Sequence, residues 1–196
     1  MNIDKLLHIQ SNKLAPQKGK ILISEPLMHD FYFGRSVVLL VEHAEEEGSF
    51  GVIMNKVVGR TLNEVVQGFP EFDAPVYLGG PVQQNNLFYI HQLGELIPQS
   101  EPIMDGLYWG GDIETIRSMM ETGHLSPGQI RFYLGYSGWD AGQLHSELER
   151  NSWLVSDASV LSLLQTRSHL MWRHFVRRMG SPYEKWLTLP EDPSLN

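Results

Sequence analysis

The stretch that decides the fold is Arg131-Phe-Tyr-Leu-Gly-Tyr-Ser-Gly-Trp-Asp-Ala-Gly-Gln-Leu-His-Ser-Glu-Leu-Glu-Arg-Asn-Ser-Trp153. Its first part is apolar and predicts a buried strand over 130–136. Glycines then predict a turn over 136–143. The turn leads into an amphipathic helix, in which Leu144 and Leu148 form the buried stripe. A further apolar run predicts a strand over 152–156. The stretch therefore reads as strand, turn, helix and strand.

The predicted turn contains more glycines and aromatic residues than a change of chain direction requires. Asp140 is followed three residues later by Gln143, which resembles a capping box at the start of the helix. Packing alone rarely needs several glycines so close to Tyr136 and Trp139. Because turns usually lie at the surface, we expect Trp139 to be exposed and available to anchor a partner.

Outward from this stretch, short apolar segments separated by turn residues predict an antiparallel sheet. The additional strands are expected at 19–24, 36–43, 50–55, 75–78, 87–91 and 107–110. Capping residues predict helices after Thr61 and Asp112. An apolar stripe predicts a last helix over 166–179. These elements predict an α+β fold, in which a mostly antiparallel sheet curls into a partial barrel with flanking helices.

Length and composition are those of one substantial domain. The chain has 196 residues, of which 42% are hydrophobic, and it contains no cysteine. This excludes disulfides, thiolate metal sites and cysteine nucleophiles. The sequence has no signal peptide and no apolar run long enough to span a membrane, so we expect a cytoplasmic protein. We expect an N-terminal extension or short helix over 1–14, the domain over 15–180 and a loose tail over 181–196.

Several short motifs follow one another in order along residues 15–180. They are Gly19-Lys-Ile-Leu-Ile-Ser-Glu-Pro, Asp30, Phe33-Gly-Arg-Ser-Val-Val, His43, Gly51-Val-Ile-Met-Asn-Lys56, Gly79-Gly-Pro-Val with the strand ending at His91, Arg131-Phe-Tyr-Leu-Gly-Tyr-Ser-Gly-Trp, and Gly142-Gln-Leu to Trp153. In this order they resemble the motifs of the YqgE/AlgH family of bacterial proteins. Several motifs in one order make the match more specific than any single pattern.

The resemblance implies an α+β fold of the family's own type and a cytoplasmic bacterial protein. It also implies a role described either as uncharacterised or as transcriptional regulation, without agreed catalytic residues. The chain departs from the family pattern at two positions. Ser137 stands where the family commonly has a small residue such as Ala, and His145 stands where it commonly has Glu.

Ser137 raises the alternative of a serine hydrolase. Gly135-Tyr-Ser137-Gly at a strand–turn–helix junction is similar to a nucleophile elbow, and Asp157 with His169 or His174 follows in a usable order. Here, however, the second glycine follows the serine directly, which breaks the Gly-x-Ser-x-Gly pattern. We therefore favour a structural role for Ser137 and predict no catalytic residue.

Scattered histidines raise the alternative of a metal site. His29, Asp30, His43 and His91 lie in three separate segments, without the tight pair on one element that zinc sites usually show. Histidines near strand ends often bond to a backbone carbonyl instead. We predict neither a metal nor a cofactor.

The hypothesis we favour is a non-enzymatic binding or regulatory protein. Its surface would combine a possible anion-binding group, a glycine turn that brings backbone amides near a ligand, and the turn before the helix. The structural alternative is a salt bridge from Arg35 to Asp30 or Glu42. The residues of the proposed surface are Asp30, Arg35, Asn55, Lys56, Gly79, Gly80, Pro81, Tyr136, Gly138, Trp139 and Gln143.

Charge limits the choice of partner. The net charge of −8 disfavours nucleic acid and anionic membranes. The last helix is an exception, because Arg167, Arg173, Arg177 and Arg178 lie between Gln165 and Gly180 with no acidic residue. Nucleic-acid binding through Arg173, Arg177 and Arg178 is the third alternative, and the favoured partner is an unidentified protein or small molecule.

Overall fold

The structure is a computed structural model that describes residues 12–181 and 183–190. Its strands are β1 (Ile21–Ser24), β2 (Val37–Ala44), β3 (Gly48–Ile53), β4 (Val57–Thr61), β5 (Pro75–Leu78), β6 (Val82–His91), β7 (Glu101–Met104), β8 (Leu107–Trp109), β9 (Ile130–Trp139) and β10 (Trp153–Ser156). Its helices are α2 (Leu62–Val65), α3 (Ile113–Glu121), α4 (Gln143–Glu149), α5 (Val160–Gln165) and α6 (Ser168–Met179), with 3₁₀ helices η1 (Gly94–Leu96), η2 (Pro127–Gln129) and η3 (Tyr183–Thr188).

The strands form one sheet in the order β10-β1-β2-β3-β9-β6-β8-β7, with β5 joined to β9 and β4 joined to β5. All the strand pairs are antiparallel except β5 with β9. This confirms an α+β fold with a mostly antiparallel sheet. The sheet does not close into a barrel, because its strand order ends at β10 and β7.

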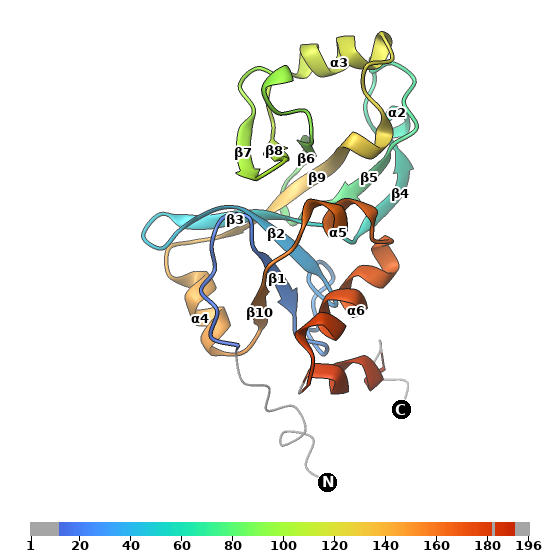
Figure 1. The fold of residues 1–196 in the computed structure, drawn as a ribbon. Helices are drawn as coiled ribbons and strands as arrows, with labels where there is room; N and C mark the ends of the chain where they lie inside the picture. Colours follow the sequence, from blue (N-terminus) through green and yellow to red (C-terminus); the bar gives the residue numbers. More distant parts are fainter. Residues whose placement is uncertain (1–11, 182, 191–196) are drawn as a thin grey trace.

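Strand β9 connects the two halves of the molecule (Figure 1). Its first residues pair with β5 and β6, while its last residues, Ser137 to Trp139, pair with β3. Strands β1, β2, β3 and β10 lie in the lower half with α4, α5 and α6, and β4 to β8 lie in the upper half with α2 and α3 (Figure 1). Strand β9 therefore lies inside the sheet, between β3 and β6.

Apolar side chains on β9 and its neighbours build three packed clusters. One lies between the lower sheet and α5, α6 and η3, and includes Trp172 and Trp186. A second fills the upper half below α3, and a third lies under α4, where Leu144 and Leu148 are buried as predicted. The helices thus cover the two faces of the lower sheet.

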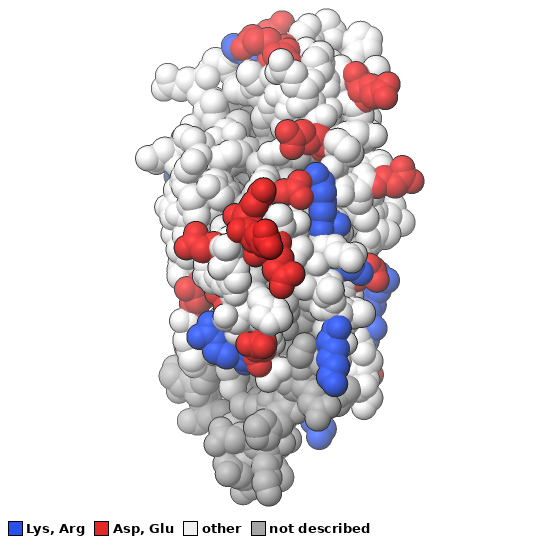
Figure 2. Space-filling view, turned by 90° about the vertical axis from the view of Figure 1, so that its left-hand side faces the viewer, with Lys and Arg blue, Asp and Glu red and all other residues white. Residues whose placement is uncertain are grey.

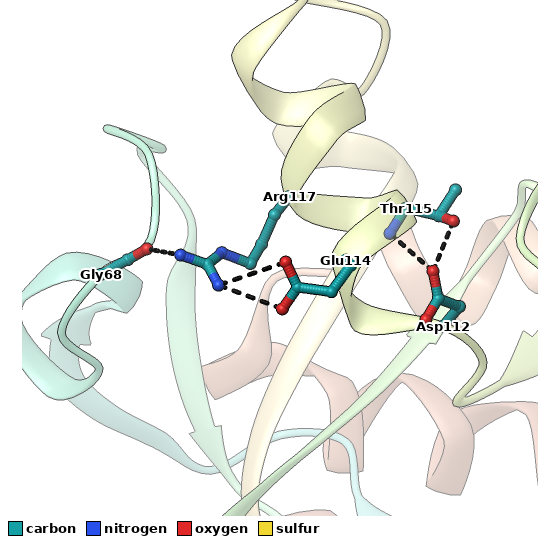
Figure 3. Close-up of polar contacts among 5 residues, drawn as sticks. All are labelled: Gly68, Asp112, Glu114, Thr115 and Arg117. Atoms are coloured by element: carbon teal, nitrogen blue, oxygen red, sulfur yellow. Dashed lines mark hydrogen bonds and ion pairs between the residues drawn. The ribbon is translucent and has the colours of Figure 1, made fainter.

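Helix α3 shows how local sequence sets the element boundaries. Asp112 caps it as predicted, accepting hydrogen bonds from the amide of Thr115 at 2.9 Å and from its hydroxyl at 2.6 Å. Arg117 then pairs with Glu114 at 3.1 Å and donates to the carbonyl oxygen of Gly68, which ties α3 to the segment after α2 (Figure 3).

Three expectations about the elements were wrong. Strand β9 continues to Trp139, three residues past its predicted end, because Ser137 to Trp139 find hydrogen-bonding partners on β3. The predicted loose tail contains η3, where Trp186 is buried and stacks on Trp172 at 6.3 Å. Strands β4 and β7 were missed. Residues 1–11, most of the predicted N-terminal extension, lie outside the described residues, as do 182 and 191–196.

Candidate functional site

The three segments chosen for the proposed surface do meet. A hollow of about 440 Å³ lies between the loop before β2, the turn before β6 and the junction of β9 with α4. Asp30, Pro81, Gly138, Trp139 and Gln143 all line it. The predicted convergence is therefore present for these five residues. The other six of the eleven residues proposed for the surface do not line this hollow, and they are Arg35, Asn55, Lys56, Gly79, Gly80 and Tyr136.

Arg35, Asn55 and Lys56 do not form an anion site. Asn55 accepts a hydrogen bond from the amide of Val37 and donates to the carbonyl of Arg35, both at 2.9 Å. Lys56 donates to the carbonyl of Gly34 at 2.8 Å. These contacts tie the end of β3 to the loop before β2, where Arg35 adopts a positive φ of 51°.

The guanidinium of Arg35 serves the same structural purpose. Its Nη2 donates to the carbonyl oxygens of Leu189 at 2.7 Å and Pro190 at 2.6 Å. Its central carbon lies 4.9 Å from the ring centroid of Trp172. Arg35 thus holds the C-terminal segment against α6, and neither the predicted anion site nor the alternative salt bridge to Asp30 or Glu42 describes these contacts.

Gly79 and Gly80 permit a close approach of two backbones, and their amides do not line a ligand site. A Cβ on Gly79 would lie 2.1 Å from the carbonyl oxygen of Gly135, and one on Gly80 would lie 2.4 Å from the backbone of Tyr136. The amide of Gly79 already donates to the carbonyl of Leu134 at 2.9 Å. Only Pro81 of this turn is exposed.

Trp139 is buried, with 5% of its surface exposed, so the expectation of an exposed anchor was wrong. The reason is that β9 carries it beneath α4. Its indole Nε1 donates to Oε2 of Glu147 at 2.9 Å, and the indole of Trp153 donates to the same oxygen at 2.7 Å. Glu147 therefore fixes two core tryptophans, while one surface of Trp139 still borders the hollow.

A larger hollow of about 690 Å³ lies on the other side of Gly138, between the β2–β3 hairpin and the ends of β6, β8 and β9. Its floor is a closed ring of four half-buried aromatic side chains. Ring centroids lie 5.6 Å apart for Phe50 and Trp109 and for Trp109 and Phe88. They lie 5.5 Å apart for Phe88 and Tyr136 and 5.8 Å apart for Tyr136 and Phe50. We refer to this space as the aromatic hollow.

The rim of the aromatic hollow is acidic. Glu42, Glu47 and Asp140 line it, and no described Lys or Arg does. A hydrogen bond from Lys18 Nζ, at 2.8 Å, lowers the pKa of the Glu42 carboxyl from its ordinary value. Acidic side chains gather near the middle of the face that carries the β2–β3 hairpin (Figure 2). The acidic segment over 45–47 at the hairpin tip is exposed.

The sequence placed only Tyr136 of these four aromatic residues in the proposed surface, and not Phe50, Phe88 or Trp109. The predicted hairpin could have placed Phe50 beside Glu42, because these two residues are direct cross-strand partners. The contribution of β6 and β8 had no such local signal. It depends on Phe88 pairing with Tyr133 on β9 and on Trp109 pairing with Ile90.

The hydrolase alternative does not fit the geometry of Ser137. The side chain is fully buried on β9, and its hydroxyl donates to the carbonyl of Gly79 at 3.0 Å. Asp157 pairs with Lys20 at 2.8 Å. A nucleophile needs an open path to its substrate and a base within hydrogen-bonding reach, so the structural role favoured for Ser137 is the one observed.

The described histidines do not gather. No group of three or more His, Asp or Glu among the described residues could hold a metal ion. The Nε2 of His91 lies 2.9 Å from the carbonyl oxygen of Gly110, as expected for a histidine near a strand end, and burial lowers the pKa of its imidazole. The Nδ1 of His43 lies 2.7 Å from the hydroxyl of its cross-strand partner Ser49.

The predicted basic helix is α6, whose apolar stripe is buried against the sheet as expected. Arg177 and Arg178 are exposed in its last turn and Arg173 is half-buried. Nucleic-acid binding by these arginines stays a prediction. Within the described chain, no helix has the length and apolar character needed to cross a membrane.

Comparisons with known proteins agree with this architecture. The AlgH-like family model matches residues 21–184. UPF0301 protein BF2109 of Bacteroides fragilis is 46% identical over 198 residues, covering all of both chains. A UPF0301 protein of Parabacteroides distasonis is 44% identical over 197 residues, covering 100% of this chain and 98% of its own.

Two solved structures have the same fold. The protein DIP2367 from Corynebacterium diphtheriae matches with a TM-score of 0.74 and 24% identity, covering 96% of this chain and 100% of its own. The AlgH protein from Pseudomonas aeruginosa, also named UPF0301, matches with a TM-score of 0.69 and 29% identity over 91% and 97% of the two chains. With its motifs, its sheet and these relatives in agreement, the chain belongs to the AlgH-like family.

Proposed function

We propose that this chain is a non-enzymatic binding protein whose ligand enters the aromatic hollow. The observation that carries the proposal is the closed ring of Phe50, Trp109, Phe88 and Tyr136, which stays half-buried at the floor of an open hollow. Large aromatic side chains left partly open to solvent usually mark a place where another molecule completes the packing. The hollow also has the volume typical of small-molecule sites.

The polar groups around this hollow support binding over catalysis. An enzyme site needs a nucleophile or a general base near the reacting atoms, held by a third group. The described polar residues around it are carboxylates, Ser49 and two glutamines, and Ser49 already contacts His43. Within the described chain no carboxylate bonds to the imidazole of His43, since Glu42 accepts only from its backbone amide, at 3.1 Å. This Ser–His contact therefore lacks the group that would orient a base.

A regulatory role, as the family resemblance implies, would then depend on ligand or partner capture. Since the mouth of the aromatic hollow shares Gly138, Trp139 and Gln143 with the smaller hollow beside it, one ligand could alter the surface around the β9–α4 junction. We place this activity in the cytoplasm. A sequence without cysteine is compatible with that reducing compartment.

The proposal is tested by nuclear magnetic resonance of the isotope-labelled protein with small-molecule fractions of a bacterial extract. We expect some fractions to shift the amide signals of the β2–β3 hairpin and of the β9–α4 junction. Trp109→Leu removes one ring of the floor and should abolish the shifts. Phe31→Leu is the matched control, because Phe31 is 80% exposed and lines neither hollow.

The control variant distinguishes binding in the hollow from nonspecific binding to exposed aromatic side chains. Loss of the shifts in Trp109→Leu with an unchanged spectrum elsewhere supports the proposal. Equal responses of Trp109→Leu and Phe31→Leu, or responses confined to other surfaces, would overturn it.

A further inference from the structure

We propose that the aromatic hollow takes a small organic cation carrying an alkylated ammonium or a guanidinium group. The inference rests on the proposed function and specifies its ligand class. It joins two independent features of the same cavity, the aromatic floor and the charge of the rim.

The floor of the hollow brings four aromatic rings together at several mutual angles. Trp109 and Phe88 are stacked with an interplanar angle of 15°, while Tyr136 meets Phe88 edge to face at 85°. A cation is attracted to the negative face of such rings, most strongly to that of Trp. Because the four rings lie at the floor of one hollow, one cationic group has more than one ring to contact.

The rim supplies the matching charge. Glu47 and Asp140 are exposed at opposite elements of the mouth, one on the hairpin and the other at the entry to α4. Within the described part of the chain neither forms an ion pair, whereas Glu42 is already paired with Lys18. Two available carboxylates over an aromatic floor raise the local concentration of cations and disfavour anions.

The shape of the cavity favours a small molecule over a long peptide. At about 690 Å³ the hollow has room for a ligand of a few to about two dozen heavy atoms. The residues that line the hollow come from the β2–β3 hairpin, from β6, β8 and β9, and from the entry to α4. A Lys-rich peptide is the competing occupant in the test.

The test uses choline, agmatine and spermidine as probes of the full-length protein, with binding followed by amide shifts. The decisive comparison is choline against 3,3-dimethylbutan-1-ol, which has the same shape without the charge. We expect at least one cation to bind in the hollow, and choline to bind about fivefold or more tightly than the alcohol if it is that cation.

The carboxylates are tested by the double variant Glu47→Gln with Asp140→Asn, whose side chains keep the same size at exposed positions. We expect about threefold weaker cation binding and a smaller dependence on salt. Glu121→Gln is the control for removing an exposed carboxylate elsewhere, because Glu121 is exposed on α3 and does not line the hollow. Trp109→Leu should abolish binding whichever cation is used.

The outcomes separate this inference from the proposed function. If neutral or anionic extract compounds bind in the hollow while all three cations fail, the binding function stands and the cation inference is overturned. The inference is also overturned if only a Lys-rich peptide binds, or if the double variant behaves as Glu121→Gln does. If neither extract fractions nor cations affect the hollow, both proposals fail.

Discussion

The hydroxyl of Ser137 donates a hydrogen bond to the carbonyl oxygen of Gly79 across 58 residues of sequence. The same carbonyl accepts a second hydrogen bond, at 3.0 Å, from the amide of Ile53. One backbone oxygen therefore joins β9, β3 and the turn before β6. The serine that resembles a nucleophile in the sequence therefore ties β9 to this turn.

Because Gly79 keeps its bond from Ile53, Ser137→Ala should cost only about 1 kcal/mol of unfolding free energy. Urea denaturation measures this loss. Ester and phosphoester substrates should be turned over no differently by the variant and the wild type. An esterase activity that disappears with the hydroxyl would contradict the structural role of Ser137.

Gly79→Ala should be far more damaging. Its Cβ would meet the carbonyl oxygen of Gly135 at 2.1 Å, a contact with backbone that cannot rotate away. We expect a loss of about 3 kcal/mol or more, or no folded protein. Gly128→Ala is the control, since a Cβ there has no neighbour within 4 Å and should change stability by less than about 1 kcal/mol. Similar melting temperatures for both variants would refute the argument from close approach.

Glu147→Ala should destabilise the packing of α4 on the sheet. It would leave the indole N–H groups of Trp139 and Trp153 without their shared acceptor. Two unsatisfied donors predict a loss of about 2–4 kcal/mol, seen in urea denaturation followed by tryptophan fluorescence. Glu149→Ala, on the same helix, removes only an exposed contact with His145 and should cost less than about 0.5 kcal/mol.

Trp186→Ala tests whether the C-terminal segment belongs to the core. Trp186 is 1% exposed and stacks on Trp172, so its truncation should cost about 3–5 kcal/mol. Thermal unfolding by circular dichroism measures the change. Glu184→Ala in the same 3₁₀ helix is exposed and serves as the control. An unchanged melting temperature in Trp186→Ala would mean that the tail is loose after all.

His91 should make stability depend on pH. Burial lowers the pKa of its imidazole below the ordinary value of 6.5, so the unfolded chain binds a proton more readily than the folded one. The contribution of neutral His91 to the free energy of unfolding is therefore complete above about pH 6.5. It decreases as the pH falls toward the pKa of the folded state. Protonation of Nδ1 would also break the bond that it accepts from the amide of Leu93 at 3.2 Å.

The measurement is the melting temperature of the wild type and His91→Gln between pH 7.5 and pH 5.5. The variant should be less stable at pH 7.5 but should lose less stability on acidification. Parallel curves for the two proteins would show that His91 is not responsible for the acid sensitivity.

The sequence predicted those helices and strands that are marked by capping residues or by the spacing of apolar residues. The capping carboxylate of Asp112 set the start of α3, and the apolar spacing of Leu144 and Leu148 predicted the buried face of α4. Apolar runs located most strands, and the motif order identified the family. Strand β4 was not predicted, because Val57 to Thr61 is largely exposed and has no buried face.

The burial and the partners of several side chains depend on which distant segments come into contact, and the neighbouring residues in the sequence do not indicate those contacts. Trp139 was expected in a turn because Gly138 precedes it, but pairing with β3 extended the strand and buried the ring. Arg35 resembled an anion ligand, yet its partners are carbonyls more than 150 residues away. The aromatic hollow joins Phe50, Phe88, Trp109 and Tyr136 from four strands. Periodicity, capping and motif order thus determined the elements and the family, because they depend on neighbours along the chain. Only the tertiary structure decided what Ser137, Arg35 and the hollow are, because contacts between distant strands determine burial and partner choice.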